Sequence, residues 1–405
     1  MVSYDINTLA SRLGCKKIPE RWNHIYAEAV SIYENGENPL LRPEYYDELH
    51  KKYKVFANTL PYYKKAAELI SKNEELSLFF CLICRALHDR DVILNDLAAL
   101  SFPQAPEGED SLPYDMLTAL AICQSYPDLY DKMKVKNIPD DIVFDTLKIS
   151  EKCVELHLSE GRPRLSSFDW YQLAYDGMLF RIGRLQVEFP LSAPNLYKIF
   201  ENRNGDIISL ANMKVHRDGF ALGAFHYEDE DGAFSAEITE TEDAFIGYPF
   251  DSFGHISKNN ITLPKTEWSV KIKSGDKMVG LHIPPGGEPF GDDVVEKTIA
   301  DSREFMKKYF PEYEYKAFFC ASWLVDPTLS TLLGNDANIS KFGKRLIPHS
   351  VNSAGKSPFV YVYHIYENHA GIDVKALPEK SRLQKLLKKH YLDGNAIYDM
   401  HGFFF

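Results

Sequence analysis

No stretch of this 405-residue sequence reaches the roughly 18 uninterrupted apolar residues that a membrane-spanning helix needs. The first residues, MVSYDINTLASRLG, have neither the basic region nor the apolar region of a secretory signal. We therefore expect a cytoplasmic protein with no membrane partner.

Cysteine is scarce and lies mostly in apolar, helical-looking segments. This placement favours buried free thiols in a reducing compartment over a disulfide framework. Cys81 and Cys84 form a C-x-x-C, but no second pair follows at zinc spacing, so one turn of a buried helix is the preferred interpretation. The six cysteines are Cys15, Cys81, Cys84, Cys123, Cys153 and Cys320.

Basic residues are outnumbered by acidic ones. Lys and Arg total 46 against 58 Asp and Glu, a formal net charge of −12. Because phosphate backbones require clustered Lys and Arg, this balance argues against a nucleic-acid partner. The motifs G-x-x-x-x-G-K-[ST] and G-x-G-x-x-G are also missing. No group of His and carboxylates matches a zinc or calcium template, so we expect no metal.

The first part of the chain has the periodicity of helices. In residues 19–35 apolar positions recur at spacings of three and four, which predicts an amphipathic helix. Residues 77–87, SLFFCLICRAL, are apolar on all sides and predict a buried helix. Residues 138–158 predict one further helix, with Pro139 in its first turn. We therefore predict an all-helical N-terminal domain over residues 1–165.

Beyond residue 165 strand patterns replace helical ones. Residues 181–191 alternate apolar and polar positions, and 196–210 predict a hairpin around an Asn-Gly turn. Residues 268–285 predict a second hairpin, and the acidic stretch 225–245 a solvated excursion. Further strands are predicted at 315–326 and 358–367, and helical segments at 292–310, 338–347 and 377–392. The fold class is therefore α+β, with a mixed sheet packed by helices over residues 166–405.

The stretch from Leu281 joins a predicted strand to a predicted helix through a glycine-rich turn, IPPGGEPFGDD. Glycines let a backbone approach an anion, and a helix N-terminus adds partial positive charge. Gly286, Gly287 and Gly291 fit that logic. Three carboxylates in or beside the turn would repel a phosphate, so a purely structural turn is the alternative. They are Glu288, Asp292 and Asp293.

The run from 281 to 346 resembles the C-terminal, GNAT-like domain of a bacterial acyltransferase family. The phrases HIPPGG, CASWLVDP and NISKFGKR carry the resemblance, and the upstream FDWYQLAYDGMLFRIGRLQVEFP looks like the junction into that domain. The helices before it would match the family's N-terminal acyltransferase domain. The resemblance covers most of the chain.

This resemblance implies a GNAT-type fold, whose mixed sheet splays between two strands and holds acyl-coenzyme A in the gap. Residues 279–283 and 292–310 would be the strand and helix around the cofactor turn. Ile283, Gly286 and Gly287, with Gly291 after them, would then contact acyl-CoA, of which acetyl-CoA is the simplest. The usual turn of that superfamily is R/Q-x-x-G-x-G/A, and PPGGEPFGDD differs from it.

Two residues are candidate catalytic bases. His282 lies at the end of its predicted strand beside the turn, facing away from the apolar set, and imidazole titrates near neutrality. Glu188 lies on the polar side of the strand at 185–189, where a partly buried carboxylate could act as a base. The alternatives are a hydrogen-bonded structural histidine and a solvated strand face.

Other residues have weaker claims on the chemistry. Cys320 or Ser322 could be a nucleophile only with a positioned base, and Asp326 before Pro327 is better explained as a helix cap. Two tyrosines are candidate acids, and three basic residues could neutralise cofactor phosphates, although a solvated helix face explains that basic cluster equally well. These are Tyr309, Tyr313, Lys341, Lys344 and Arg345.

The leading hypothesis is an acyl-CoA-dependent N-acyltransferase acting on a small-molecule amine. The alternative is a non-catalytic binding or regulatory protein with a GNAT-like fold, which the acidic turn favours. A hydrolase using Cys320 or Ser322 beside His282 is a third hypothesis. The helical domain would either cover the acceptor side of the cleft or pair subunits into a homo-oligomer.

Overall fold

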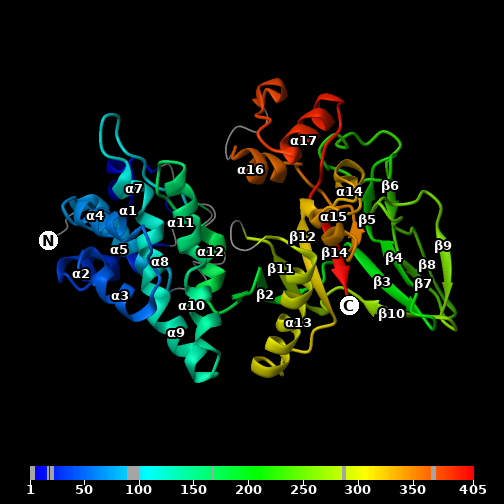
Figure 1. Cartoon of the computed structure of the whole chain (residues 1–405), viewed down its shortest axis with the longest axis horizontal. Coiled ribbons are helices and arrows are strands. Elements are labelled where there is room, and N and C mark those ends of the chain that lie inside the picture. Colours follow the sequence, from blue (N-terminus) through cyan, green and yellow to red (C-terminus); the bar gives the residue numbers. More distant parts are fainter. Residues whose placement is uncertain are drawn as a thin grey trace. The chain divides into compact units, whose positions relative to one another are not determined.

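The computed structural model divides the chain into two compact units, Met1–Ile182 and Gly183–Phe405 (Figure 1). The structure describes residues 5–15, 18, 22–88, 100–166, 168–284, 289–365 and 371–405. None of the helices in these ranges combines the length and the apolarity needed to cross a bilayer.

The first unit is built from helices, as predicted. The buried helix predicted at 77–87 is confirmed as α5, where Asn73 Oδ1 accepts a hydrogen bond from Leu76 N–H (2.8 Å) and starts the helix. The helices of this unit are α1 (Ile6–Arg12), α2 (Asn23–Glu34), α3 (Tyr45–Tyr53), α4 (Leu60–Ser71), α5 (Glu74–Ala86), α7 (Leu112–Asp115), α8 (Leu117–Ile122), α9 (Tyr126–Val135), α10 (Asp140–Leu147), α11 (Ile149–Ser159) and α12 (Phe168–Tyr175); β1 (Leu179–Ile182) ends the unit.

The prediction of one helix over 138–158 is wrong. Two helices, α10 and α11, meet at Lys148, whose φ of −84° and ψ of 1° end the first of them. Leu147 and Ile149 are both buried but would point to opposite sides of a straight helix. The break lets each half turn its own apolar face into the core.

The second unit contains a mixed central sheet in which five strands run in the order β2-β11-β12-β14-β13. β11 and β12 are parallel, and the other neighbours are antiparallel. The strands are β2 (Leu185–Ser192), β11 (Lys277–His282), β12 (Ala317–Ser322), β13 (Ile347–His349) and β14 (Met400–Phe404). The C-terminal strand β14 lies between β12 and β13 and was not predicted from the sequence.

Smaller sheets account for the rest of the β-structure. They are β10-β3-β4, β5-β6 and β7-β8-β9. The bounds are β3 (Tyr197–Asn202), β4 (Ile207–Ala211), β5 (Met213–Val215), β6 (Phe234–Ala236), β7 (Thr239–Glu240), β8 (Ala244–Gly247), β9 (Ile261–Pro264) and β10 (Trp268–Ile272). The Asn-Gly hairpin is confirmed as β3–β4, where Gly205 has a φ of +85° that suits glycine.

One strand prediction in this region is wrong, and the prediction of a solvated excursion is only partly right. The hairpin expected over 268–285 does not form, because β10 pairs with β3 while β11 pairs with β2 and β12. The segment 225–245, predicted to be a solvated excursion, is mostly exposed, but it contains β6, β7 and the first residues of β8. Ala236 and Phe245 are buried there, so these residues belong to small hydrophobic clusters despite the acidic composition.

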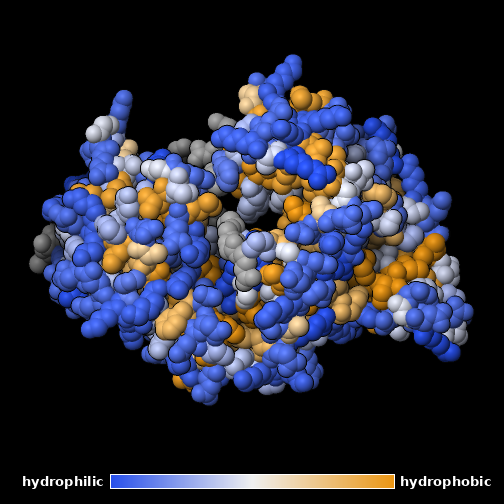
Figure 2. All heavy atoms as spheres, in the orientation of Figure 1, coloured by the Kyte–Doolittle hydropathy of each residue, from blue (hydrophilic) through white to orange (hydrophobic). Residues whose placement is uncertain are grey.

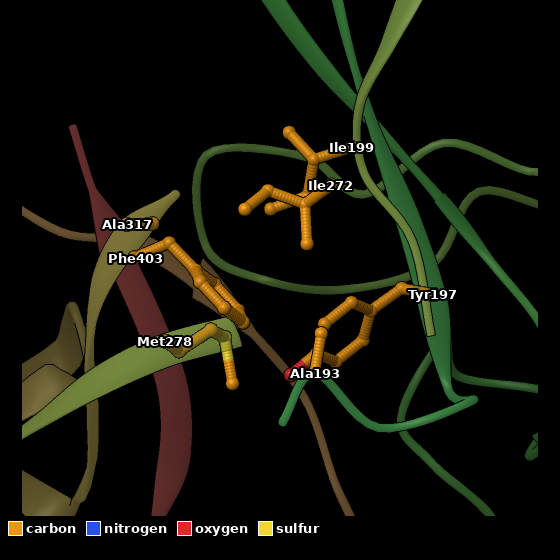
Figure 3. Packing of buried hydrophobic residues seen from close by; sticks show 7 residues of the cluster. All are labelled: Ala193, Tyr197, Ile199, Ile272, Met278, Ala317 and Phe403. Atoms are coloured by element: carbon orange, nitrogen blue, oxygen red, sulfur yellow. The ribbon is translucent and has the colours of Figure 1, made fainter. Parts of the chain in front are cut away.

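A cluster of buried side chains joins the β10-β3-β4 sheet to the central sheet (Figure 3). Tyr197, Ile199 and Ile272 come from the small sheet and face Met278 and Phe403 of the central one. Each fully buried side chain of this kind contributes about 1.5–3 kcal/mol to folding relative to an exposed one. This core therefore holds the start of β11, through Met278, at the end of the strand that lies away from the turn leading to α13.

The helices of the second unit follow most of the predicted periodicities. They are α13 (Asp292–Tyr309), α14 (Thr328–Leu333), α15 (Asn338–Gly343), α16 (Ser357–Tyr363) and α17 (Arg382–Leu392). The predictions at 292–310, 338–347 and 377–392 are confirmed by α13, α15 and α17. Ser381 and Gln384 form a capping box that starts α17.

The strand predicted over 358–367 is wrong within the described residues, because 357–363 form α16. Pro358 occupies the first turn of that helix, where a missing N–H costs nothing. Phe359 then stacks on Tyr391 of α17, with ring centroids 4.8 Å apart. Tertiary packing has overridden the β-branched and aromatic composition.

Candidate active site

The two predicted bases, His282 and Glu188, meet in the structure. His282 ends β11 and Glu188 lies on the antiparallel neighbour β2, where the register places Gly280 opposite Glu188. His282 lies two residues further along, so the two side chains are diagonal neighbours on one face of the sheet. His282 Nε2 is 2.7 Å from Glu188 Oε2. Sequence reasoning found both residues but not their contact.

The pair is partly covered. The side chain of His282 is 24% exposed and that of Glu188 is 14% exposed. An ionised carboxylate can only accept hydrogen bonds, so when Glu188 is ionised the imidazole Nε2–H is the donor in this contact. The carboxylate thereby orients the ring and favours the tautomer whose lone pair is on Nδ1, the arrangement of a base held by a third group.

Gly280 provides the space for this contact. A Cβ at this position would lie 2.6 Å from Leu191 Cδ1 and 3.3 Å from Glu188 Oε2. The glycine therefore allows the Glu188 side chain to cross β11 towards His282.

We expect Gly280→Ala to lower the turnover number about ten-fold or more, because an added methyl group displaces the Glu188 carboxylate and misplaced catalytic groups lose rate steeply. Steady-state kinetics with a saturating acyl donor measures the change. Gly371→Ala is the matched control, since a Cβ there meets no atom of the described residues within 4 Å. A Gly280→Ala variant with the kinetics of the parent protein would show that Glu188 need not be held in place.

The sheet opens beside this pair. The parallel ladder between β11 and β12 ends at Gly280 and Phe319, although β11 continues to His282 and β12 to Ser322. At its last two residues β11 pairs with β2 along one edge, and the ladder to β12 has already ended along the other. The implied splay between two parallel strands is thus present, with His282 at its edge.

The turn after β11 leads into the N-terminus of α13. Ile283 is partly buried, whereas Gly286 and Gly287 lie outside the described residues. Gly291 precedes the helix with a φ of −80° and a ψ of 156°, and no side chain of the described residues caps the first turn. The N–H groups of that turn can therefore bind an anion.

Two arginines from elsewhere in the chain supply positive charge at this turn. Arg345 pairs with Asp292 and, through Nε, with Glu296 Oε1 (2.7 Å). The hydrogen bond from Arg345 lowers the pKa of the Asp292 carboxyl. Arg184, only 7% exposed, donates from Nη1 to Pro284 O (2.8 Å). The local sequence contains no cation, so the turn looked more acidic than the structure makes it.

Arg184 was missed as a site residue. Its only signal was its position one residue before the strand that carries Glu188. The guanidinium also lies 5.4 Å from the Phe290 ring centroid, which ties it to the far side of the turn. Arg345 was a candidate for phosphates, but the structure pairs it with carboxylates.

The weaker candidates have structural roles. Cys320 is buried in β12, and burial raises the pKa of its thiol to about 12, so it is not a ready nucleophile. Ser322 Oγ accepts from Leu324 N–H (3.1 Å). The capping role of Asp326 is confirmed by the bond from Thr328 N–H to its Oδ1 (2.9 Å). Tyr313 OH is bonded to backbone groups of β2 and β11, rather than facing His282.

Comparison with protein-family models gives two matches that together cover most of the chain. Residues 43–177 match the N-acyltransferase N-terminal domain, and residues 179–404 match the GNAT-like C-terminal domain. The chain belongs to the family of proteins that carry this GNAT-like C-terminal domain. The GNAT-like domain contains both His282 and Glu188 and coincides closely with the second compact unit.

Three solved structures share the fold over 99% of both chains. An acyltransferase mutant in complex with octanoyl-CoA is 17% identical with a TM-score of 0.62. An acyltransferase in complex with decanoyl-CoA is 18% identical with a TM-score of 0.60, and one with decanoyl-CoA and teicoplanin is 18% identical with a TM-score of 0.62. At such identities the likeness shows the fold alone. No curated protein matches the chain.

Proposed function

We propose that this protein transfers an acyl group from acyl-CoA to the nitrogen of an amine. The observation that carries the proposal is the 2.7 Å contact between His282 Nε2 and Glu188 Oε2 at the edge of the splay between β11 and β12. A general base has to lie beside the reacting amine, and this pair combines an imidazole with a carboxylate that orients it.

The proposed acyl transfer requires few chemical groups from the protein. When bound, acyl-CoA supplies a thioester, whose C–S bond is replaced by a C–N bond to the acceptor. His282 takes the proton that the amine loses, and Glu188 stabilises the imidazolium that results. The proton can then return to the departing thiolate, so that the reaction is balanced without a further reactant.

The residues at the turn fit the phosphates of coenzyme A. The N–H groups at the start of α13, next to Gly291, would hold a pyrophosphate, and Ile283 would contact the cofactor near the splay. Gly286 and Gly287 stay predictions. Arg345 neutralises Asp292 and Glu296, which removes part of the repulsion that the acidic turn implied.

The acceptor is proposed to be a small-molecule amine, and the acyl chain one of medium length. A solved structure of the same fold holds decanoyl-CoA together with teicoplanin, and another holds octanoyl-CoA. We place the reaction in the cytoplasm, because all six cysteines are free and buried, as a reducing compartment favours. The helical unit would cover the acceptor or pair subunits.

The test is calorimetric titration of the full chain with acetyl-, octanoyl- and decanoyl-CoA, followed by thiol release in the presence of an amine panel. We expect binding and amine-dependent release. The proposal fails if none of the three donors binds at concentrations up to about 1 mM, the upper end of ordinary KM values. Binding without turnover against any amine would favour the non-catalytic alternative.

A substitution at the start of α13 tests whether the cofactor binds there. Gly291→Val is expected to weaken acyl-CoA binding at least ten-fold, because a Cβ there lies 2.8 Å from Asp293 Oδ1 and crowds the anion position. Gly371→Val is the matched control, because a Cβ at Gly371 has no neighbour within 4 Å in the part of the chain that the structure describes. Equal affinities in the two variants would move the cofactor away from α13.

A further inference from the structure

The second unit contains a cavity of about 660 Å³ away from His282 and Glu188. Its walls come from β4, residues 249–252, β9, the segment from Leu324 through α14, and residues 339–348, including α15. We call it the α15 cavity. Its volume lies within the range of about 300–1,000 Å³ that small-molecule sites have.

Apolar side chains that are not fully buried form much of this wall. Ile207 and Ile208 of β4, Ile261 of β9 and Ile339 of α15 line the cavity and are each partly exposed. Figure 2 shows hydrophobic surface over the region of β4, β8 and β9. Ile207 also packs against one hydrophobic cluster of this unit, and Ile208 and Ile261 pack against another, but each keeps part of its surface exposed. Apolar surface left exposed at a hollow is typical of a binding site.

Two serine hydroxyls in the same wall have no hydrogen-bond partner among the residues that the structure describes. They are Ser209 Oγ on β4 and Ser340 Oγ on α15. Ser209 is 3% exposed and Ser340 is 1% exposed, so both are well over nine-tenths buried. A buried hydroxyl without a partner is unfavourable, and a polar ligand group would relieve that cost. Both serines are lining residues of the cavity, one on β4 and the other on α15.

The charges at the cavity point to an uncharged ligand. Lys344 and Asp251, both exposed, lie in the lining and have opposite signs. Asp326 also lines the cavity, but its two carboxylate oxygens accept from Thr328 N–H and Tyr398 N–H. A charged group placed against Ser209 and Ser340 would be buried without a counter-ion, which is costly. A neutral hydroxyl or carbonyl avoids that cost.

The helix α15 separates this cavity from the cofactor turn. Ile339, Ser340 and Gly343 line the cavity, whereas Phe342 packs against Phe290 of the turn, with ring centroids 5.3 Å apart. Arg345, just after the helix, pairs with Asp292 of α13. The cavity and the turn therefore lie against different faces of one short helix and are separate sites.

We propose that the α15 cavity is a binding site for an uncharged, mainly apolar small molecule whose hydroxyl or carbonyl group pairs with Ser209 and Ser340. The isoleucines hold the apolar body, and the two hydroxyls select for the polar group. This site is independent of acyl-CoA, so it stands whether or not the proposed acyl transfer is correct.

The experiment compares two probes of the same shape, 4-propylphenol and propylbenzene, by ligand-observed NMR titration of the full chain. We expect the phenol to bind about ten-fold more tightly, since only it can pair with the buried hydroxyls. Ser340→Ala and Ser209→Ala should each reduce that preference. Equal affinities for the two probes in the parent protein would overturn the proposal.

The location is tested by filling the cavity. Ser330→Trp, on the lining face of α14, should abolish phenol binding, while Thr331→Trp, exposed on the same helix and outside the lining, should not. Retained binding in a folded Ser330→Trp variant would overturn the proposal. Decanoyl-CoA should not compete with the phenol; full competition would assign the probe to the cofactor site instead.

Should Ser330→Trp fail to fold, the serine-to-alanine pair and a crystal soaked with 4-propylphenol answer the same question. Density for the phenol between Ser209 and Ser340 supports the proposal, and density only elsewhere refutes it. Absence of acyl-CoA binding would count against the proposed transfer reaction alone, since the phenol measurements do not depend on it.

Discussion

His282→Gln should lower the turnover number of acyl transfer by about 10²–10⁴-fold, the usual contribution of a positioned general base. Glutamine keeps a polar side chain but has no group that takes a proton near neutrality. The structure places this residue at the edge of the splay, 24% exposed, rather than in the α13 turn. The affinity for acyl-CoA, measured by calorimetry, should therefore change little while the turnover number falls.

Glu188→Gln is the companion variant. It leaves the shape of the side chain intact but removes the charge that stabilises a protonated imidazole, so we expect a loss of about 10–100-fold. Because the two side chains act as a unit, the double variant should be little worse than His282→Gln alone. His255→Gln, in the same unit and part-exposed, is the control. Full activity in His282→Gln would remove the base from the proposed mechanism.

The second large effect is a pH dependence in the helical unit. Glu151 of α11 is fully buried, and burial raises the pKa of its carboxyl from 4.5 to about 8, against the opposing effect of hydrogen bonds from Thr59 and Tyr63. The carboxyl is therefore neutral in the folded protein near neutrality. In the unfolded chain it ionises above about 4.5.

The sign follows from the extra proton that the folded state holds. The stability that neutral Glu151 contributes is fully present below pH 4.5 and is lost as the pH rises towards 8. The reason is that the carboxyl of the unfolded chain loses its proton at a lower pH than the carboxyl of the folded protein. Between pH 5 and pH 8 the free energy of unfolding of this unit should fall by on the order of 3 kcal/mol from this group.

Glu151→Gln should remove that slope, since an amide does not titrate. Calorimetric unfolding of the full chain at pH 5, 6.5 and 8 measures it, with the variant compared with the parent protein at each pH. Glu107→Gln, at an exposed position of the same unit, is the control. A Glu151→Gln variant that keeps the slope of the parent would place the pH dependence on other groups.

The sequence alone predicts those helices and hairpins whose pattern is contained in one continuous segment. The periodicity of 292–310 and 377–392 is enough to define α13 and α17, and Asn204-Gly205 is enough to close the β3–β4 hairpin. The placement of β14 was not predictable in the same way. Its partners β12 and β13 are distant in sequence, and pairing between strands depends on contacts that no short window contains.

For the candidate site, too, the sequence predicts some features and the tertiary structure decides others. The residue types and the strand–turn–helix order, with the resemblance they carry, made His282, Glu188 and Gly291 candidates from the sequence alone, and their roles stay predictions. Only the tertiary structure could join His282 to Glu188, because their contact depends on the β2–β11 register and on the space left by Gly280. It likewise brings Arg184 and Arg345 to an acidic turn, since charges far apart along a chain interact only after folding sets their distance.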